Sequence, residues 1–202
     1  AIYPIPLAII LISIILLNGI LNKALLIPFK VNISYKEAFG LATITNFYNL
    51  ITPFRGGAAA RAIYLKKKHD FPYVHFLATL SAIYILIFLV SSITGIFSML
   101  ILPEKNNLIL LALSLFAIFL LAITIFSPKI KERKNKWLDR IIKVVNGWNL
   151  IKNNKRIITI TLIISILQIF LSAINNLIAY QIFGITISIP AALFISAISS
   201  LS

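Results

Sequence analysis

Four long apolar stretches constrain the fold of this chain more than any other feature of its sequence. They cover about residues 2–27, 72–102, 108–127 and 157–180. A helix needs about 20 mainly apolar residues to cross the hydrocarbon core of a bilayer, and each stretch meets that length. With 60% hydrophobic residues and a mean hydropathy of +1.00, the chain has more apolar surface than a soluble domain needs. The sequence therefore predicts an all-α integral membrane protein with about four transmembrane helices.

Three further segments complete one predicted transmembrane domain over residues 1–202. Residues 35–67 are predicted to form a re-entrant helical hairpin, residues 129–156 a basic amphipathic segment, and residues 190–202 a truncated apolar segment. The chain starts without methionine and ends inside this last segment. We therefore expect it to be a fragment of a longer polytopic protein.

Basic residues greatly outnumber acidic ones, with 19 lysines and arginines against 5 aspartates and glutamates, for a net charge of +14. Polybasic patches on membrane proteins usually face anionic lipid headgroups. Nucleic acid is the weaker explanation, because the basic residues lie between the predicted spans. We therefore expect the membrane and an anionic lipid as partners, and no nucleic acid.

Side chains that perform chemistry are scarce in this sequence. It has no cysteine, which excludes disulfides, thiolate catalysis and cysteine metal sites. The two histidines and five scattered acids form no metal cluster and no acid–base pair. The sequence therefore predicts no metal, no cofactor and no catalytic residue, which disfavours an enzyme that acts on a lipid carrier.

Ile44–Lys68 is the one stretch where polar residues, proline and glycine interrupt the apolar sequence. Pro53 ends a first helix, because the residue before a proline avoids the α conformation. Gly56 and Gly57 permit backbone conformations closed to other residues, and the alanines that follow favour a second short helix. The stretch therefore predicts a helix, a break and a second helix.

The distribution of basic residues predicts the orientation of the spans. The most basic loop, Ser127–Arg156, is assigned to the inside, which places Pro103–Asn106 outside and Arg61–Asp70 inside. Both ends of residues 35–67 then face the cytoplasm, so this segment enters the cytoplasmic (cell) membrane and returns. In the rival interpretation residues 35–51 cross the membrane, and the lysines that follow lie outside, against the charge rule.

The tip of this hairpin, Pro53–Gly57, is the predicted functional site. Non-helical backbone at membrane depth is tolerated only inside protein or beside a watery cavity. The start of the second helix directs free N–H groups and a positive dipole end into that cavity, which suits a phosphate. The predicted lipid-phosphate ligands are Arg55, Gly56, Gly57 and Arg61, and the predicted polar lining is Asn46, Asn49, Gln168, Ser172 and Asn175.

Three of these interpretations have open alternatives. Plain anchoring to surface lipids is the alternative role for Arg55 and Arg61. The polar face of the fourth span, which includes Gln168 and Asn175, either packs against another helix or lines a polar path. Residues 129–156 carry tryptophan and aliphatic residues at helical spacing, which is typical of a helix in the headgroup region. A solvated loop is the alternative for that segment.

Around the glycine pair the sequence resembles the transmembrane region of the lysylphosphatidylglycerol synthase/flippase family. The residues that carry this resemblance are Asn46 or Asn49, Pro53, Gly56, Gly57 and Arg61, followed by a basic run and a long span. The resemblance implies a polytopic membrane protein that handles lipid. In the best-known members this region moves an aminoacylated phospholipid across the bilayer, and some relatives are associated with polyprenyl-linked glycan assembly.

The predicted function is therefore binding of an anionic or phosphate-bearing lipid with flippase-like translocation. The resemblance implies an anionic phospholipid or a polyprenyl phosphate as that lipid. The alternative function is a membrane scaffold or regulator, whose partner is an enzyme that modifies lipids or polyprenyl-linked glycans.

Overall fold

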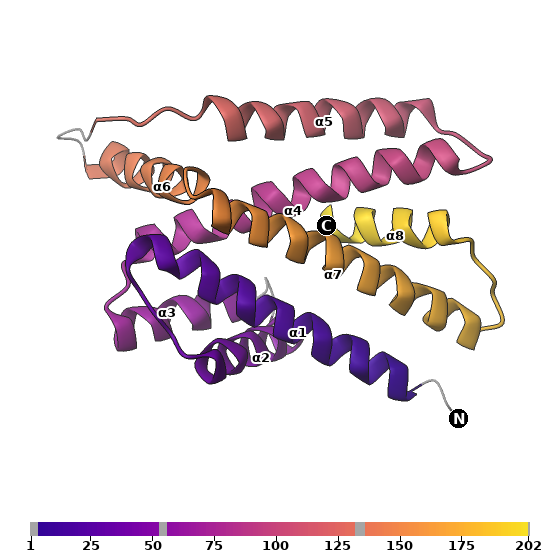
Figure 1. The fold of residues 1–202 in the computed structure, drawn as a ribbon, viewed down its shortest axis with the longest axis horizontal. Helices are drawn as coiled ribbons and strands as arrows, with labels where there is room; N and C mark the ends of the chain where they lie inside the picture. The colour runs from indigo at the N-terminus through magenta and orange to yellow at the C-terminus, as the bar shows by residue number, and fades with distance from the viewer. Residues whose placement is uncertain (1–3, 53–55, 132–135, 202) are drawn as a thin grey trace. The chain divides into compact units, whose positions relative to one another are not determined.

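The computed structural model describes residues 4–52, 56–131 and 136–201, and the regular structure within these ranges is entirely helical (Figure 1). The elements in chain order are α1 (Pro4–Leu26), the 3-10 helix η1 (Ile27–Phe29), α2 (Tyr35–Ile51), α3 (Gly57–His69), α4 (Tyr73–Ile101), α5 (Asn107–Phe126), α6 (Lys136–Lys152), α7 (Lys155–Ile182) and α8 (Ile189–Leu201). The prediction of an all-α protein is confirmed.

Four of the described helical segments are long and apolar enough to cross a membrane, namely α1 with η1, α4, α5 and α7. The shortest of them, α5, has 20 residues. At a rise of about 1.5 Å per residue it extends about 30 Å, which matches the hydrocarbon core of a bilayer. The predicted class, an integral membrane protein with four transmembrane helices, is confirmed by these lengths and compositions.

The chain divides into two compact units, each with its own internal contacts. Unit 1 comprises residues 1–14, 84–126 and 162–202, and unit 2 comprises residues 15–83 and 127–161. The predicted hairpin and the basic segment both belong to unit 2.

In unit 1, an apolar cluster and a hydrogen bond between polar side chains each join two helices. An apolar cluster of Leu89, Ala117 and Leu120 joins α4 to α5. A hydrogen bond of 2.9 Å from Asn176 Nδ2 to Ser196 Oγ joins α7 to α8. Small and polar residues are common in the interfaces of membrane helices, because lipid supplies no hydrophobic drive for helix association.

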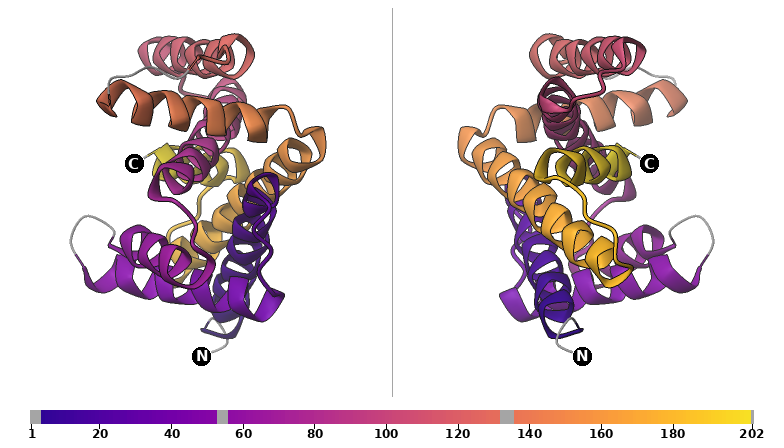
Figure 2. Two further views of the ribbon diagram at one scale, coloured as in Figure 1. Left: turned by 90° about the vertical axis from the view of Figure 1, so that its left-hand side faces the viewer. Right: turned by 90° about the vertical axis from the view of Figure 1, so that its right-hand side faces the viewer.

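In unit 2, α2 and α3 pack against each other as a helical hairpin, the violet pair in both views of Figure 2. Ser34 caps the start of α2, because its hydroxyl accepts a hydrogen bond of 3.1 Å from the Glu37 amide. Apolar side chains from this hairpin, the end of α1 and the start of α4 form one core. Its buried members are Leu26, Ile33, Ala38, Leu41, Ala62, Leu65, Phe71 and Phe76.

Gly57 marks a very close approach between the two helices of the hairpin. A Cβ atom on it would lie only 2.0 Å from Thr45 O and 2.7 Å from Asn49 Oδ1. Gly56 has ordinary helical torsion angles, with φ −58° and ψ −11°. Gly56 therefore does not use the conformational freedom that the sequence offers it, and the reason for a glycine at position 57 is space between two backbones.

The basic segment after the third span forms a regular helix, α6, that is fixed to the chain before it. The Asn146 side chain exchanges two hydrogen bonds with the backbone of Ile130, of 3.0 and 2.8 Å. Trp148 Nε1 donates a further bond of 2.9 Å to Ser127 Oγ. These contacts favour the predicted amphipathic helix over a loop without structure.

Candidate functional site

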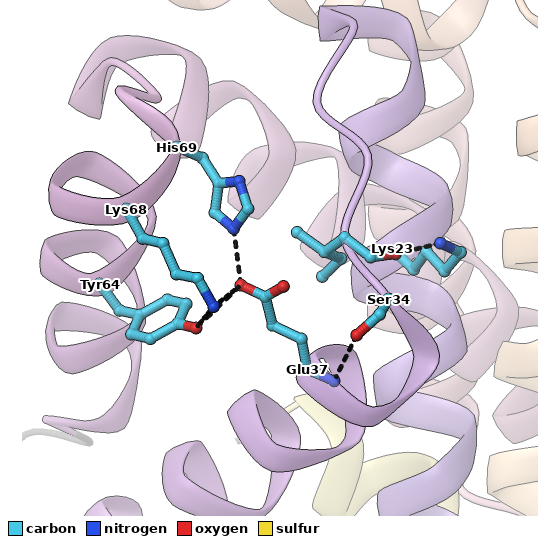
Figure 3. Close-up of polar contacts among 7 residues, drawn as sticks. Lys23, Ser34, Glu37, Tyr64, Lys68 and His69 are labelled. Atoms are coloured by element: carbon cyan, nitrogen blue, oxygen red, sulfur yellow. Dashed lines mark hydrogen bonds and ion pairs between the residues drawn. The ribbon is translucent and has the colours of Figure 1, made fainter.

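A cluster of polar side chains joins the beginning of α2 to the end of α3 (Figure 3). Glu37 of α2 lies at its centre, and its Oε1 atom accepts hydrogen bonds from three residues of α3. Tyr64 Oη lies at 2.8 Å, His69 Nε2 at 2.6 Å and Lys68 Nζ at 3.3 Å. Lys68 Nζ also donates to Tyr64 Oη at 2.9 Å. These four residues form the Glu37 clamp, which closes the hairpin at the end opposite its turn.

The clamp keeps Glu37 ionised. Only 14% of this side chain is exposed, and burial by itself raises the pKa of a carboxyl group. The hydrogen bonds from His69, Tyr64 and Lys68 outweigh burial and lower the pKa of Glu37 from 4.5 to about 2. Glu37 therefore remains charged at physiological pH and offsets the positive charge of Lys68.

A groove of about 390 Å³ opens beside the clamp, between α2 and α3. Lys36 and Lys68 provide exposed cations in its lining, Glu37 provides the carboxylate that pairs with Lys68, and Leu41 and Ile44 provide apolar surface. Cations bind phosphate oxygens through charged hydrogen bonds, and apolar surface suits the hydrocarbon next to a headgroup. The groove therefore has the surface chemistry of a site for an amphiphilic anion.

Arg61 lies deeper in the same unit, with only 8% of the residue exposed. Its guanidinium donates a hydrogen bond to Asn22 Oδ1 of α1. It also lies over the ring of Phe76 of α4, with 5.1 Å between the guanidinium carbon and the ring centroid. Cation–π contacts of this kind stabilise a cation that has lost its water. Arg61 thus connects α3 to both α1 and α4.

A small cavity lies next to the Arg61 side chain and has a volume of about 10 Å³. Apolar side chains make up most of its lining, and Asn22, Arg61 and Thr79 contribute the polar surface. This volume is room for about one water molecule. A phosphate group is larger, so the cavity does not accommodate one unless the surrounding helices separate.

The two glycine amides at the hairpin turn are not free, in contrast to the expectation from the sequence. Gly56 N donates to Thr52 Oγ1, and Gly57 N donates to Asn49 Oδ1, each at 3.0 Å. Thr52, which follows the last residue of α2, thus satisfies the amide just before α3, and Asn49 of α2 satisfies the first amide of α3, as capping side chains do. The expectation of free amides is wrong, and a phosphate at Gly56 and Gly57 requires both caps to be released.

The remaining predicted hairpin residues have different surroundings. Arg55 lies outside the described residues, as does Pro53. Asn46 is half-buried, and its side chain donates a hydrogen bond of 3.0 Å to Ala42 O in its own helix. The predicted ligand role of Arg55 and the predicted lining role of Asn46 therefore stay predictions.

The other predicted lining residues, Gln168, Ser172 and Asn175, are half-buried on α7 in unit 1, whereas the hairpin belongs to unit 2. Their role in lining a polar path stays a prediction. The bond from the adjacent Asn176 to Ser196 favours the alternative, in which this region of α7 packs against another helix.

The members of the Glu37 clamp are functional candidates that the sequence did not reveal. Tyr64 and Lys68 are four residues apart, which places them on one face of α3, and this spacing was the available signal. Glu37 lies 27 residues before Tyr64 and 32 before His69. Only the antiparallel pairing of α2 and α3 brings the carboxylate to its donors.

Comparison with known proteins agrees with the class that these helices indicate. The sequence matches the family described as the lysylphosphatidylglycerol synthase TM region over residues 2–202. No curated protein and no solved structure matches the chain. The family match covers essentially the whole chain, and four described helices are apolar enough to span a membrane. The chain is therefore a multi-pass membrane protein that belongs to the lysylphosphatidylglycerol synthase TM region family.

Proposed function

We propose that this chain binds a phosphate-bearing anionic lipid at the α2–α3 hairpin and takes part in moving it across the membrane. The observation that carries the proposal is the burial of Arg61, a permanently charged side chain, within the hairpin of a membrane protein. Charged residues withdrawn from water in such proteins are costly and commonly mark a substrate pathway. The family is named for lysylphosphatidylglycerol, a phospholipid, which supports the same class of ligand.

In this proposal the lipid phosphate first meets Lys36 and Lys68, the exposed cations of the groove beside the clamp. It then reaches Arg61 when the hairpin moves away from α1 and α4. The cavity of about 10 Å³ next to Arg61 supports this order of events, because it is too small for a phosphate. In this proposal the described conformation is therefore the closed one, in which a lipid phosphate has no access to Arg61.

Arg61→Gln should slow translocation of a fluorescent anionic phospholipid in reconstituted vesicles by about tenfold or more. A hydrogen bond to a charged group contributes about 1.5–3 kcal/mol, which corresponds to roughly a tenfold to hundredfold change in rate or affinity. Arg55→Ala, measured in the same way, tests the second predicted phosphate ligand. A wild-type rate for both variants would refute the proposed site.

Asn22→Ala is the matched control for Arg61→Gln, because it removes a hydrogen-bond partner of Arg61 and keeps the charge. If Arg61 binds the phosphate, Asn22→Ala should retain most of the transport rate. If Arg61 only holds α3 against α1, both variants should lower the melting temperature and the transport rate alike.

The re-entrant course of residues 35–67 is part of the proposal and has its own test. The chain has no cysteine, so Lys67→Cys and Lys105→Cys each introduce a single labelling site, and both positions are exposed. We expect a membrane-impermeant maleimide to label Lys105→Cys on intact cells, and Lys67→Cys only after permeabilisation. The reverse pattern would mean that residues 35–51 cross the membrane.

A membrane scaffold is the second candidate function, and the surface of α6 favours it. Trp137 and Ile141 are 75% and 58% exposed, and the guanidinium carbon of Arg140 lies 5.7 Å from the Trp137 ring centroid. Such a surface fits a lipid headgroup layer or a partner protein. Two results together would favour the scaffold. An enzyme should purify with the wild type but not with Ile141→Ser, and the pure protein should transport no lipid.

A further inference from the structure

A second pocket in unit 2, with a volume of about 240 Å³, lies where the end of α1 meets the start of α7. Lys23, Tyr35 and Arg156 contribute polar groups to its lining, and the apolar side is mainly isoleucine. None of its lining residues belongs to the groove beside the Glu37 clamp or to the cavity at Arg61. It is therefore a separate site, away from the hairpin turn.

Lys23 is held in a fixed position at this pocket (Figure 3). Its Nζ atom donates to Asn32 Oδ1 at 2.9 Å and to the backbone oxygen of Ile33. The same atom lies 4.9 Å from the centroid of the Tyr35 ring. These partners are neutral, so they orient the ammonium group and leave its charge uncompensated within this set of contacts.

Arg156, the second cation of the pocket, is exposed, and it makes no hydrogen bond or ion pair with the described residues. The carboxylates in the described part of unit 2 are already engaged: Glu37 in the clamp, Asp70 with a lysine at 2.5 Å, and Asp139 with a lysine at 2.7 Å. None of these carboxylates lines the pocket. The anion that pairs with Arg156 therefore has to come from outside the described part of unit 2.

The order of residues along the two helices matches the order of groups in a phospholipid. Arg156 lies in the first turn of α7, and Ile157 and Ile160 follow it toward the middle of that candidate span. On α1, Ile20 lies about one turn from Lys23, also toward the middle of a span. Lys23 and Arg156 thus lie near the ends of the spans, where headgroups are. Ile20, Ile157 and Ile160 lie deeper, and Ile27 lines the pocket on the headgroup side of Lys23.

The charge at the start of α7 points to an anion for an independent reason. Lys155 and Arg156 both lie in the first turn, and that turn contains no acidic residue. Positive side chains are unfavourable at the positive end of a helix dipole. A bound anion at this position relieves the repulsion and supplies the missing counter-charge.

We propose that this pocket holds one anionic phospholipid, with its phosphate between Lys23 and Arg156 and its acyl chain against Ile20, Ile157 and Ile160. The lipid neutralises both cations and fills the space between α1 and α7. It acts as a bound structural lipid and not as the transported one, so the site goes beyond the proposed function of the hairpin.

Added phosphatidylglycerol should raise the melting temperature of the delipidated protein in detergent more than added phosphatidylcholine does. In Arg156→Gln the apparent Kd for phosphatidylglycerol, taken from this stabilisation, should rise about tenfold, because a charged hydrogen bond is lost. Ile160→Trp, which fills the apolar part of the pocket without changing charge, should weaken the same stabilisation. Native mass spectrometry should find fewer bound phosphatidylglycerol molecules on both variants.

Lys155→Gln is the matched control, because it removes a neighbouring exposed charge that does not line this pocket. It should keep the wild-type Kd. The inference would be overturned if Lys155→Gln weakened phosphatidylglycerol binding as much as Arg156→Gln does. It would also be overturned if phosphatidylglycerol and phosphatidylcholine stabilised the protein equally. A third contradicting result would be millimolar inorganic phosphate that raises the melting temperature as much as phosphatidylglycerol does. A free anion and not a lipid would then occupy the site. Lipid transport by Arg156→Gln is measured separately from phosphatidylglycerol binding. A negative result for this pocket is therefore distinct from a negative result for the proposed transport site at Arg61.

Discussion

Gly57→Ala should lower the melting temperature of the detergent-solubilised protein by roughly 4–8 °C, given about 2–4 °C per kcal/mol for a chain of this size. The added methyl group would lie 2.0 Å from Thr45 O. Thr45 O is a backbone atom and cannot rotate away, so α2 and α3 have to separate. Overpacking costs about 1–3 kcal/mol, and a contact of 2.0 Å with a backbone atom places this site at the upper end of that range. About 2 kcal/mol of destabilisation therefore remains after the gain of about 1 kcal/mol from replacing glycine by alanine in a helix.

Gly56→Ala provides the matched control one residue earlier. Its new methyl group would lie 2.5 Å from Thr52 Oγ1, a side-chain atom that can turn aside at the loss of two hydrogen bonds, one from Gly56 N and one to Tyr48 O. A neutral hydrogen bond contributes about 1 kcal/mol, and water can replace part of both lost bonds because Thr52 and Gly56 are only half-buried, so we expect a change of less than about 4 °C. Equal losses in the two variants, or an unchanged Gly57→Ala protein, would contradict the close approach of the two helices.

Glu37→Gln should have the second largest effect, with a melting temperature roughly 4–8 °C lower at pH 7. The substitution keeps the size of the side chain and removes the charge that accepts bonds from Tyr64, Lys68 and His69. Hydrogen bonds to a charged group contribute about 1.5–3 kcal/mol, and we expect a total loss of about 2 kcal/mol because the amide oxygen of glutamine still accepts one of them. The measurement is thermal unfolding in detergent, followed by tryptophan fluorescence.

The pH dependence of this effect has a definite sign. The pKa of Glu37 is lowered from 4.5 to about 2 in the folded protein, so the unfolded chain binds the proton more readily. The stabilisation by Glu37 is therefore complete above pH 4.5 and declines as the pH falls toward 2. The difference in melting temperature between the wild type and Glu37→Gln should be constant from neutral pH down to about 5 and shrink below that.

Asp70→Asn is the control for the loss of a paired carboxylate. The Asp70 side chain is 91% exposed and pairs with Lys66 at 2.5 Å, and exposed ion pairs contribute little. Its backbone has a φ of +52°, which asparagine also adopts readily. We expect almost no change in the melting temperature. The role of the clamp would be refuted if Asp70→Asn lowered the melting temperature as much as Glu37→Gln does. It would also be refuted if the full difference in melting temperature between the wild type and Glu37→Gln persisted at pH 3.

In the hairpin, the sequence predicts the helices but not the contacts between them. Pro53 and the alanines after Gly57 predicted two short helices with a break, and α2 and α3 begin and end close to those positions. From the sequence, the glycine pair predicts backbone freedom and free amides. Instead, Gly57 is explained by the distance to another helix, and Thr52 and Asn49 occupy the two amides. Capping of Gly57 by Asn49 of the opposite helix depends on how the hairpin closes, which residue types alone do not specify.

The sequence by itself determined the class of the protein, the four apolar spans and the excess of positive charge, because apolar length and composition are local properties of a chain. The tertiary structure alone decided that Glu37 meets three donors of α3, that Arg61 lies against Asn22 and Phe76, and that Arg156 shares a pocket with Lys23. Each of these contacts joins residues that are distant in sequence. Which of them meet depends on the helices that pack side by side, and hydrophobic periodicity does not encode that choice.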